Sequence, residues 1–213
     1  MTTIAILGSG HVARALVGRF RDAGHEVVVG SRDPHGSAAT GWTASAVRVV
    51  GLPDAAGAAE VIVNAMPGSA SVRTLTALAA QLSGKVLLDV ANAVEFDPDG
   101  FAAALLYPGG SLAEELQRAL PEARVVKTLN TVHDSVMADP ARLSTPPSVF
   151  VSGNDADAKK IVTGLLIDLG WSPEWIIDLG NVETARVPEA FALMIRHLIH
   201  ALGPVPFAMA IAR

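Results

Sequence analysis

A glycine-rich turn near the start of the chain has the residue types and spacing of a phosphate-binding site. The apolar run Thr3–Leu7 leads directly into Gly8-Ser9-Gly10-His11-Val12-Ala13. Gly8 allows a tight bend off a strand, and Gly10 lets a pyrophosphate approach the backbone because it has no side chain. A glycine turn without a ligand is the alternative. We predict that the backbone of the turn and of the following helix binds the pyrophosphate of a dinucleotide, through Gly8, Ser9, Gly10, His11 and Val12.

The end of the second apolar run indicates which dinucleotide binds. His25–Val29 is followed by Gly30, Ser31 and Arg32. Proteins that prefer NAD usually have Asp or Glu here, and its carboxylate binds the ribose hydroxyls. Arg32 instead offers a planar cation that suits a 2′-phosphate, and Ser31 offers a hydroxyl. We therefore predict NADP(H) as the cofactor. In the alternative, Arg32 is an ordinary surface arginine and Asp33 binds the ribose.

Two further turns follow predicted strands and could flank the nicotinamide end of the cofactor. One ends the apolar run that begins at Val61, and the other follows the run Lys85–Asp89. Ligands of open α/β sheets bind beyond the carboxyl ends of the strands. Loop packing is the alternative role for each turn. We expect five residues of these turns to lie beside the nicotinamide: Ala65, Met66, Pro67, Asn92 and Ala93.

The residues best suited to catalysis follow a third run, Arg124–Thr128. Asn130 and His133 fall where a second substrate would meet the nicotinamide, and His133 could donate a proton near neutral pH. Within the run, Lys127 must pair or extend its ammonium toward solvent. In the alternative, Asn130 caps a turn and His133 is solvated. No other pattern resembles a general acid for a carbonyl, which favours hydride transfer between two ring systems, since that needs chiefly proximity and orientation.

These sites need parallel strands that end at one edge of a sheet. Strand and helix patterns alternate along the chain, which predicts an α/β fold with a Rossmann-type, doubly wound and mostly parallel sheet. We expect an NADP-binding domain over residues 1–152 and a small C-terminal α/β extension over residues 153–213, which forms a cleft and a candidate dimer face. Asp89–Ser111 is expected to be a long loop. The expected strands are Thr3–Leu7, His25–Val29, Val47–Val50, Val61–Ala65, Lys85–Asp89, Arg124–Thr128, Ser148–Val151 and Trp175–Asp178, and the expected helices are Val12–Ala23, Ser69–Gln81, Leu112–Leu120, Asp155–Leu169 and Val187–Leu202.

The composition excludes several classes of protein. Of 213 residues, 50% are hydrophobic and 17% charged, which permits a well-filled core and excludes disorder. The chain has no cysteine, and His197 and His200 lack a third ligand nearby, so we expect neither thiol chemistry nor a metal site. The net charge of −5 argues against nucleic acid as a partner. No apolar run approaches the ~20 residues of a membrane span and no signal peptide is evident, so we expect a cytoplasmic protein without a membrane partner.

Several motifs together resemble the NADPH-dependent coenzyme F420 reductase family. They are residues 8–13, residues 23–32, Asp89–Asn92, Glu114–Leu116 and Val125–Thr131. The resemblance covers nearly the whole chain and is strongest over the first 132 residues. It implies a Rossmann domain with a small C-terminal part, often a homodimer, and reversible hydride transfer between NADP(H) and an 8-hydroxy-5-deazaflavin, coenzyme F420. By position, Gly8 to Val12 match the pyrophosphate loop, and Ser31 and Arg32 match the 2′-phosphate site. The turn Met66–Ser69 departs from the family because it lacks an aromatic residue.

Three functions remain open from the sequence. The first is hydride transfer between NADPH and a deazaflavin such as coenzyme F420. The second is reduction of an imine or another small unsaturated substrate. The third is a non-catalytic protein that senses NADP(H). Catalysis is favoured if the Asn130–His133 cluster and Asp89–Ser111 line a cleft that faces the nicotinamide, whereas sensing is favoured if a side chain fills that space.

Overall fold

The computed structural model describes residues 1–36, 42 and 47–212. Within this part of the chain, one eight-stranded sheet has the order β10-β9-β8-β5-β4-β1-β2-β3. Neighbouring strands are parallel except β8 and β9, which are antiparallel. This arrangement confirms the predicted Rossmann-type α/β fold. The strands are β1 (Thr3–Leu7), β2 (Glu26–Ser31), β3 (Arg48–Gly51), β4 (Val61–Asn64), β5 (Val86–Asp89), β8 (Arg124–Lys127), β9 (Val149–Gly153) and β10 (Ile176–Gly180).

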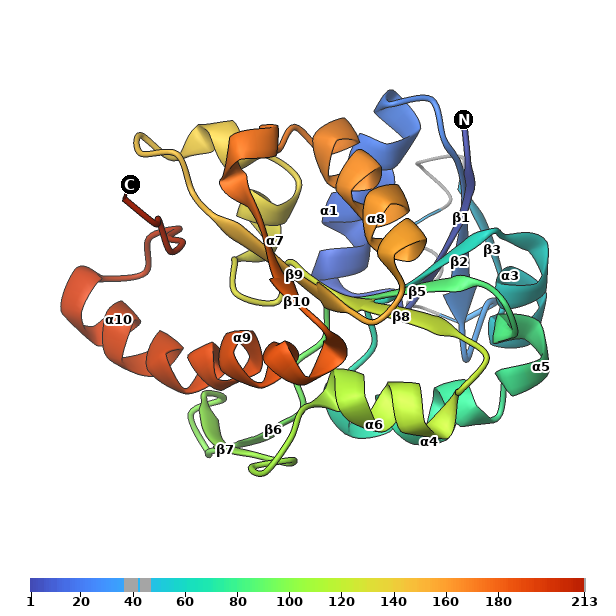
Figure 1. Ribbon diagram of the computed structural model, residues 1–213, viewed down its shortest axis with the longest axis horizontal. Helices are drawn as coiled ribbons and strands as arrows, with labels where there is room; N and C mark the ends of the chain where they lie inside the picture. Colours follow the sequence, from blue (N-terminus) through green and yellow to red (C-terminus); the bar gives the residue numbers. More distant parts are fainter. Residues whose placement is uncertain (37–41, 43–46, 213) are drawn as a thin grey trace.

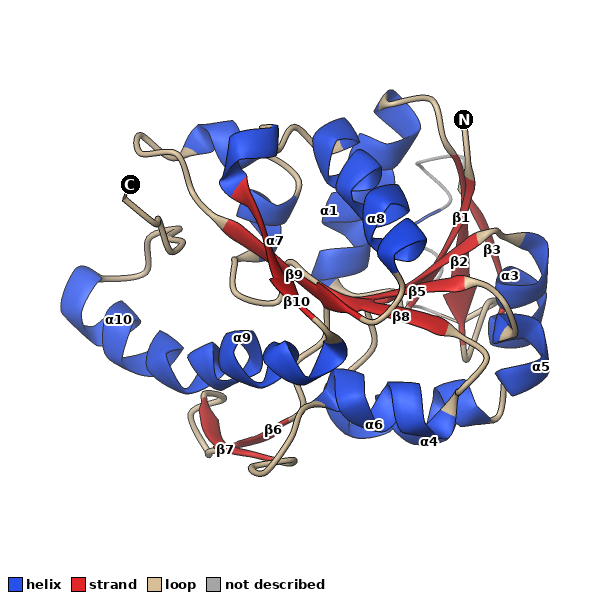
Figure 2. Ribbon diagram, in the orientation of Figure 1, coloured by secondary structure: helices blue, strands red, loops and turns tan. Residues whose placement is uncertain are grey.

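Helices cover both faces of the sheet (Figure 2). Alternate residues of a strand point to opposite faces. In β1, Ile4 and Ile6 therefore join the core under one helical layer, while Ala5 and Leu7 join the core under the other. All four residues are fully buried. The first layer contains α1 (His11–Asp22), α7 (Asp134–Met137) and α8 (Ala156–Asp168), and the second contains α3 (Leu52–Ala58), α4 (Gly68–Thr76), α5 (Ala79–Leu82) and α6 (Leu112–Ala119).

A helical arm follows β10 and extends away from the sheet toward the C-terminal end (Figure 1, orange to red). It consists of η3 (Val182–Ala185), α9 (Arg186–Ala190), η4 (Phe191–Met194) and α10 (Ile195–Leu202). The chain beyond the arm returns to β9, because Ser148 N donates to Met209 O at 2.8 Å. Strand β10, which belongs to the expected C-terminal extension, pairs with β9 in the common sheet. Two short 3₁₀ helices lie elsewhere, η1 (Pro140–Arg142) and η2 (Pro173–Trp175).

The segment Asp89–Ser111 is not the long loop that the sequence predicted. It contains a β-hairpin of β6 (Val94–Phe96) and β7 (Ala102–Leu105). The Asp97 carboxylate forms the turn by accepting hydrogen bonds from Asp99 N and Phe101 N, both at 2.9 Å. A side-chain turn of this kind gives a weak sequence signal when the strands are only three and four residues long.

The prediction of the helices was incomplete in three respects. The expected helix Ser69–Gln81 is split into α4 and α5 around Ala77 and Leu78. The short helices α3 and α7 were not predicted, because seven and four residues are too few for a clear helical repeat. The expected terminal helix Val187–Leu202 is helical, but η4 interrupts its α-helical geometry.

Candidate functional site

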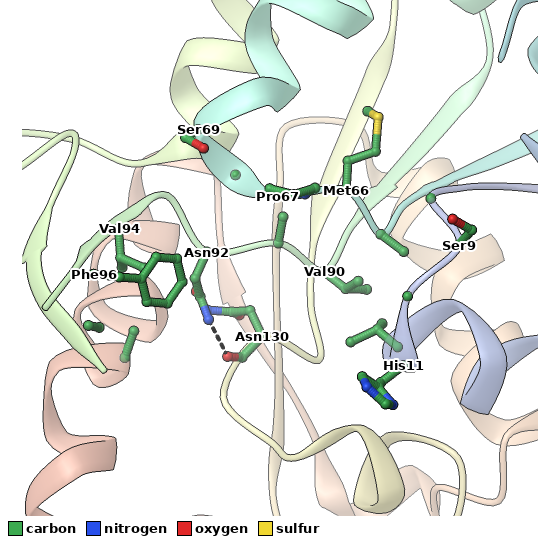
Figure 3. Close-up of a pocket in the computed structure, with 18 of the residues that line it drawn as sticks. Ser9, His11, Met66, Pro67, Ser69, Val90, Asn92, Val94, Phe96 and Asn130 are labelled. Atoms are coloured by element: carbon green, nitrogen blue, oxygen red, sulfur yellow. Dashed lines mark hydrogen bonds between the residues drawn. The ribbon is translucent and has the colours of Figure 1, made fainter. Parts of the chain in front are cut away.

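A cavity of about 920 Å³ opens at the carboxyl ends of the central strands. The glycine turn after β1 and the end of β2 form one side of it. The turns after β4, β5 and β8 form its middle, and the β6–β7 hairpin and the helical arm form its far side. Figure 3 shows this order, with Ser9 and His11 on one side, Phe96 on the other, and Asn92 and Asn130 between them. The cavity thus runs from the glycine turn to the hairpin and the helical arm.

The glycine turn is shaped as a cradle for an anion. Gly8 has φ 125°, and a Cβ there would lie 2.4 Å from Ala65 O, so this position requires glycine. Gly10 is the N-cap residue directly before α1, and a Cβ there would project into open space. Among the described residues, no side chain caps the first turn of α1, and that turn contains no acidic residue. The turn therefore presents backbone N–H groups and the positive end of a helix dipole, a donor set that fits a pyrophosphate.

Ser31 and Arg32 both line the cavity beside the glycine turn. Ser31 is buried, and its Oγ accepts a hydrogen bond from Asp33 N at 3.2 Å. Arg32 is exposed at the cavity mouth. Within residues 1–36, 42 and 47–212, no carboxylate pairs with its guanidinium. Asp33 lines the same region, so the predicted 2′-phosphate contact of Arg32 and the alternative ribose contact of Asp33 both stay predictions.

The middle of the cavity contains four of the five residues predicted beside the nicotinamide. Ala65, Met66, Pro67 and Asn92 line it. Ala93 does not, because it is buried under the hairpin, where its carbonyl accepts a hydrogen bond from Leu106 N at 2.9 Å. Gly68, directly after Pro67, has no room for a side chain, since a Cβ there would lie 2.2 Å from Asn92 O. The turns after β4 and β5 are therefore packed against each other.

Asn92 and Asn130 lie side by side in the middle of the cavity lining (Figure 3). Asn92 Nδ2 donates to Asn130 O, and Asn130 Nδ2 donates to Asn92 Oδ1, both at 2.9 Å. Each side-chain amide still has one N–H for another partner, and Asn130 keeps its Oδ1. The structure thus brings together the two asparagines that the sequence placed after separate strands.

His133 is not among the residues that line the cavity. Its side chain is 63% exposed and caps α7, where Nδ1 lies 2.9 Å from Ser135 Oγ and 3.3 Å from Ser135 N. The chain turns away after Asn130, and Val132 and Met137 line the cavity in its place. The structure therefore separates the two predicted catalytic residues, and His133 has the solvated position that the sequence left as its alternative.

The far side of the cavity is apolar and was not recognised in the sequence. Phe96 is 68% exposed and lines this region. The hairpin is tied to the arm by Arg196, which pairs with Asp97 and lies 3.2 Å from Asp99. The Arg196 guanidinium also lies 5.7 Å above the Phe101 ring. The sequence signal that could have revealed this apolar surface is the presence of Phe96 and Phe101 in a stretch otherwise rich in Ala, Gly and Pro. The apolar lining consists of Val94, Phe96, Phe101, Ala102, Ala192 and Ile195.

A buried ion pair lies next to the cavity, behind the lining residue Ala91. Lys127 Nζ contacts Asp89 Oδ2 and Glu189 Oε1, both at 2.8 Å, and donates to Ala91 O. Burial disfavours the ammonium, but the two carboxylates outweigh it and hold the pKa of Lys127 above its usual value. The sequence predicted that Lys127 must pair or reach solvent, and it pairs. Glu189 was missed because it lies 62 residues further along the chain, on α9.

Neither a metal centre nor a membrane-spanning helix occurs in the part of the chain that the structure describes. Among the described residues, no three His, Cys, Asp or Glu side chains are arranged to hold a metal ion. In the same part of the chain, no helix is long and apolar enough to cross a membrane.

The fold and the cavity define a Rossmann-type dinucleotide-binding protein. The family described as NADP oxidoreductase, coenzyme F420-dependent, matches residues 3–93. A crystal structure of a candidate F420-dependent NADP reductase from Arthrobacter sp. FB24 is 42% identical, covers 100% of both chains and superposes with a TM-score of 0.92. The chain belongs to this family of coenzyme F420-dependent NADP oxidoreductases.

Two curated relatives show how far the similarity extends. The F420-dependent NADP reductase of Methanocaldococcus jannaschii is 32% identical over 157 residues, which are 69% of this chain and 66% of the relative. The metalloreductase STEAP3 of Rattus norvegicus is 33% identical over 192 residues, or 90% of this chain. This chain spans 36% of the length of STEAP3, so the similarity concerns one part of that protein.

Proposed function

We propose that this protein transfers hydride between NADPH and a flat deazaflavin-type acceptor, coenzyme F420. The observation that carries the proposal is the composition of the cavity along its length. Its ionisable lining residues within the described chain are His11, Arg32 and Asp33, all on the nucleotide side. Its opposite side is apolar, and the amide groups of two asparagines lie between the two sides.

The nucleotide side suits NADP(H) on chemical grounds. Backbone N–H groups of His11 and Val12 would bind the pyrophosphate, and Arg32 with Ser31 would bind the 2′-phosphate. When bound, the nicotinamide ring supplies or accepts the hydride. Met66, Pro67 and Val90 would exclude water from one side of that ring, because they line the adjoining part of the cavity. Asn92 and Asn130 would orient the polar edge of the reacting rings through their remaining amide groups.

The far side suits a flat hydrophobic ring. Phe96 offers an exposed aromatic face there. The turn Met66–Ser69 carries no aromatic residue, so aromatic contact with a ring on this side comes from the hairpin. Aromatic rings stack with other flat ring systems at modest energetic gain and with defined geometry. Ring-to-ring hydride transfer depends chiefly on such placement, so this surface favours a deazaflavin over a small aliphatic imine. The open volume on this side favours catalysis over a sensing role, because none of the side chains that the structure describes fills it.

The arm is proposed to join two copies of the chain in a homodimer. Val187, Met194 and Leu202 of the arm, and Val205 just beyond it, are each at least 51% exposed, and no residue of α10 is buried. An exposed apolar face of this kind usually has a partner. Light scattering after size-exclusion chromatography should give twice the mass of the chain, and Leu202→Glu should lower it. A monomer at all concentrations would contradict the proposal.

The activity can be tested by mixing the protein with NADPH and oxidised coenzyme F420. The absorbance of the deazaflavin should fall as NADPH is consumed in equal amount. A matched control is Ile161→Ala, a 40% exposed residue of α8, which should leave the rate unchanged. Tight NADPH binding without any loss of deazaflavin absorbance would reject coenzyme F420 as the acceptor.

A further inference from the structure

Three neighbouring strands end in polar side chains that are completely buried. Asn64, Asp89 and Lys127 are the last residues of β4, β5 and β8, and they lie side by side in register. They are at most 1% exposed. Asn64 Nδ2 donates to Asp89 Oδ1 at 2.8 Å, and Asp89 Oδ2 lies 2.8 Å from Lys127 Nζ. A continuous polar row therefore crosses the sheet next to the cavity.

This row fixes the two turns that line the middle of the cavity. Asn64 Oδ1 accepts a hydrogen bond from Met66 N at 3.3 Å. Both backbone groups of Ala91 are also held, since its N–H donates to Asp89 Oδ1 at 3.2 Å and its carbonyl accepts from Lys127 Nζ. The next residue, Asn92, then reaches Asn130. The conformation of this turn thus depends on buried side chains and not on a helix or strand.

Glu189 extends the row from the sheet to the helical arm. Its Oε1 lies 2.8 Å from Lys127 Nζ, and its carboxylate accepts hydrogen bonds from Leu112 N at 2.8 Å and Ala113 N at 3.2 Å. Three residues further along the arm, Ala192 lines the far side of the cavity, and Ile195 follows. The Glu189 carboxylate therefore links Lys127, at the end of β8, to the part of the arm that lines the far side of the cavity.

We propose that Lys127 and Glu189 are positioning residues. They set the distance between the turn after β5 that contains Ala91 and Asn92 (the nicotinamide turn) and the part of the arm that lines the cavity at Ala192 and Ile195 (the acceptor wall), and hydride transfer depends on this distance. The proposal rests on the function proposed above. Neither residue lines the cavity, so neither touches the cofactor or the acceptor. Lys127 acts through Ala91 and Asn92, and Glu189 acts through the arm. Small displacements of reacting groups reduce rates strongly, by about 100-fold for 1 Å, so the geometry of this link should affect the reaction more than binding.

Glu189→Gln is the test variant because it keeps the shape of the side chain and removes its charge. Lys127→Met is expected to unfold the protein, since it leaves the carboxylates of Asp89 and Glu189 buried without a counter-ion. The matched control is Lys159→Met, because Lys159 also bonds an aspartate and a carbonyl, Asp178 at 2.8 Å and Gly180 O at 3.1 Å, but does not line the cavity.

The readout is the single-turnover rate of hydride transfer to oxidised coenzyme F420 at saturating NADPH, together with the affinity for 2′,5′-ADP, which occupies only the adenosine side. In Glu189→Gln the rate should fall about 10- to 100-fold, while the affinity for 2′,5′-ADP should stay within about twofold. Lys159→Met should change neither quantity. An unchanged rate in folded Glu189→Gln, or an equal loss of 2′,5′-ADP affinity, would overturn the positioning role.

A second readout separates this inference from the proposed function. If the wild-type protein reduces no deazaflavin, the proposed acceptor is wrong, but the position of the nicotinamide turn can still be measured. The ratio of NADPH affinity to 2′,5′-ADP affinity reports the contribution of the nicotinamide half. Glu189→Gln should lower this ratio about fivefold or more, on the scale of one lost well-placed contact, and an unchanged ratio would overturn the inference whatever the acceptor is.

Discussion

Asn92 and Asn130 form two hydrogen bonds with each other in the lining of the cavity, and in each bond Nδ2 of one residue lies 2.9 Å from an oxygen of the other. Leu129, directly before Asn130, has φ 63°, a left-handed conformation that is unfavourable for leucine. Among the described residues, it is the one non-glycine residue with positive φ. Backbone strain of this kind persists only where the surroundings enforce it, and it is common at functional sites.

Asn130→Ala should slow hydride transfer without loss of the adenosine site. The substitution removes the bond to Asn92 Oδ1 and the amide that faces the cavity, while the backbone bond from Asn92 remains. We expect the single-turnover rate to fall about tenfold or more and the affinity for 2′,5′-ADP to be unchanged. A rate equal to that of the wild type would show that the asparagine pair is a packing feature of the loops.

Arg32→Ala should weaken NADPH binding far more than NADH binding. The guanidinium lines the cavity at the end of β2, where a 2′-phosphate would lie. Loss of a charge-assisted hydrogen bond should cost ~1.5–3 kcal/mol of NADPH binding free energy. Isothermal calorimetry with both cofactors measures the difference. Equal losses for NADPH and NADH would mean that Arg32 does not bind the phosphate.

Gly10→Ala should leave a folded protein that binds NADPH poorly. Gly10 has φ −81°, which alanine adopts readily, and its Cβ would enter the open space in front of α1. Crowding of the pyrophosphate should cost about 1–3 kcal/mol of binding free energy. The matched control is Gly18→Ala in the same helix, where a Cβ also meets open space. This control should stabilise the fold by ~0.5–1 kcal/mol and leave NADPH affinity unchanged. Normal NADPH binding by Gly10→Ala would place the pyrophosphate elsewhere.

The ion pair between Glu114 and Arg186 should make stability depend on pH in the acid range. A hydrogen bond from Arg186 holds the pKa of Glu114 below its usual value, against the opposing effect of burial. The carboxylate therefore stabilises the fold above its unfolded-state pKa, and this contribution disappears as the pH falls through the folded-state pKa. Urea unfolding should show Glu114→Gln to be less stable than the wild type at pH 7, with a difference that shrinks below about pH 4. A constant difference across this range would exclude the assignment.

The shape of the glycine turn and of the end of β2 was predictable because local rules determine it. The turn after β1 needs glycine for its positive φ and for the close approach of Ala65 O, so the glycines themselves mark the site. The end of β2 follows from a continuous apolar run of a buried parallel strand. Both features lie within the first 32 residues and need no long-range information.

The apolar far side of the cavity was not predictable because its parts meet only in the folded chain. Phe96 and Ile195 lie 99 residues apart and line the same side of the cavity. Glu189 reaches Lys127 from α9, and nothing in its local sequence distinguishes it from a surface carboxylate. His133 was expected beside Asn130 from its short spacing, but its ring caps α7 and points outside the cavity. The positions of these side chains depend on contacts between distant parts of the chain, so their spacing in the sequence could not predict them.

The most direct test of the central claim follows the transferred hydrogen itself. NADPH carrying deuterium at C4 of the nicotinamide is incubated with the wild-type protein and oxidised coenzyme F420, and the reduced deazaflavin is examined by mass spectrometry and NMR. The proposed function predicts that deuterium appears on the carbon of the deazaflavin that accepts the hydride, from one face of the nicotinamide only. The reaction is run separately with NADPH labelled on each of the two faces of C4. Reduced deazaflavin without deuterium from both labelled forms, or no reduction while NADPH is bound, would contradict the proposed function.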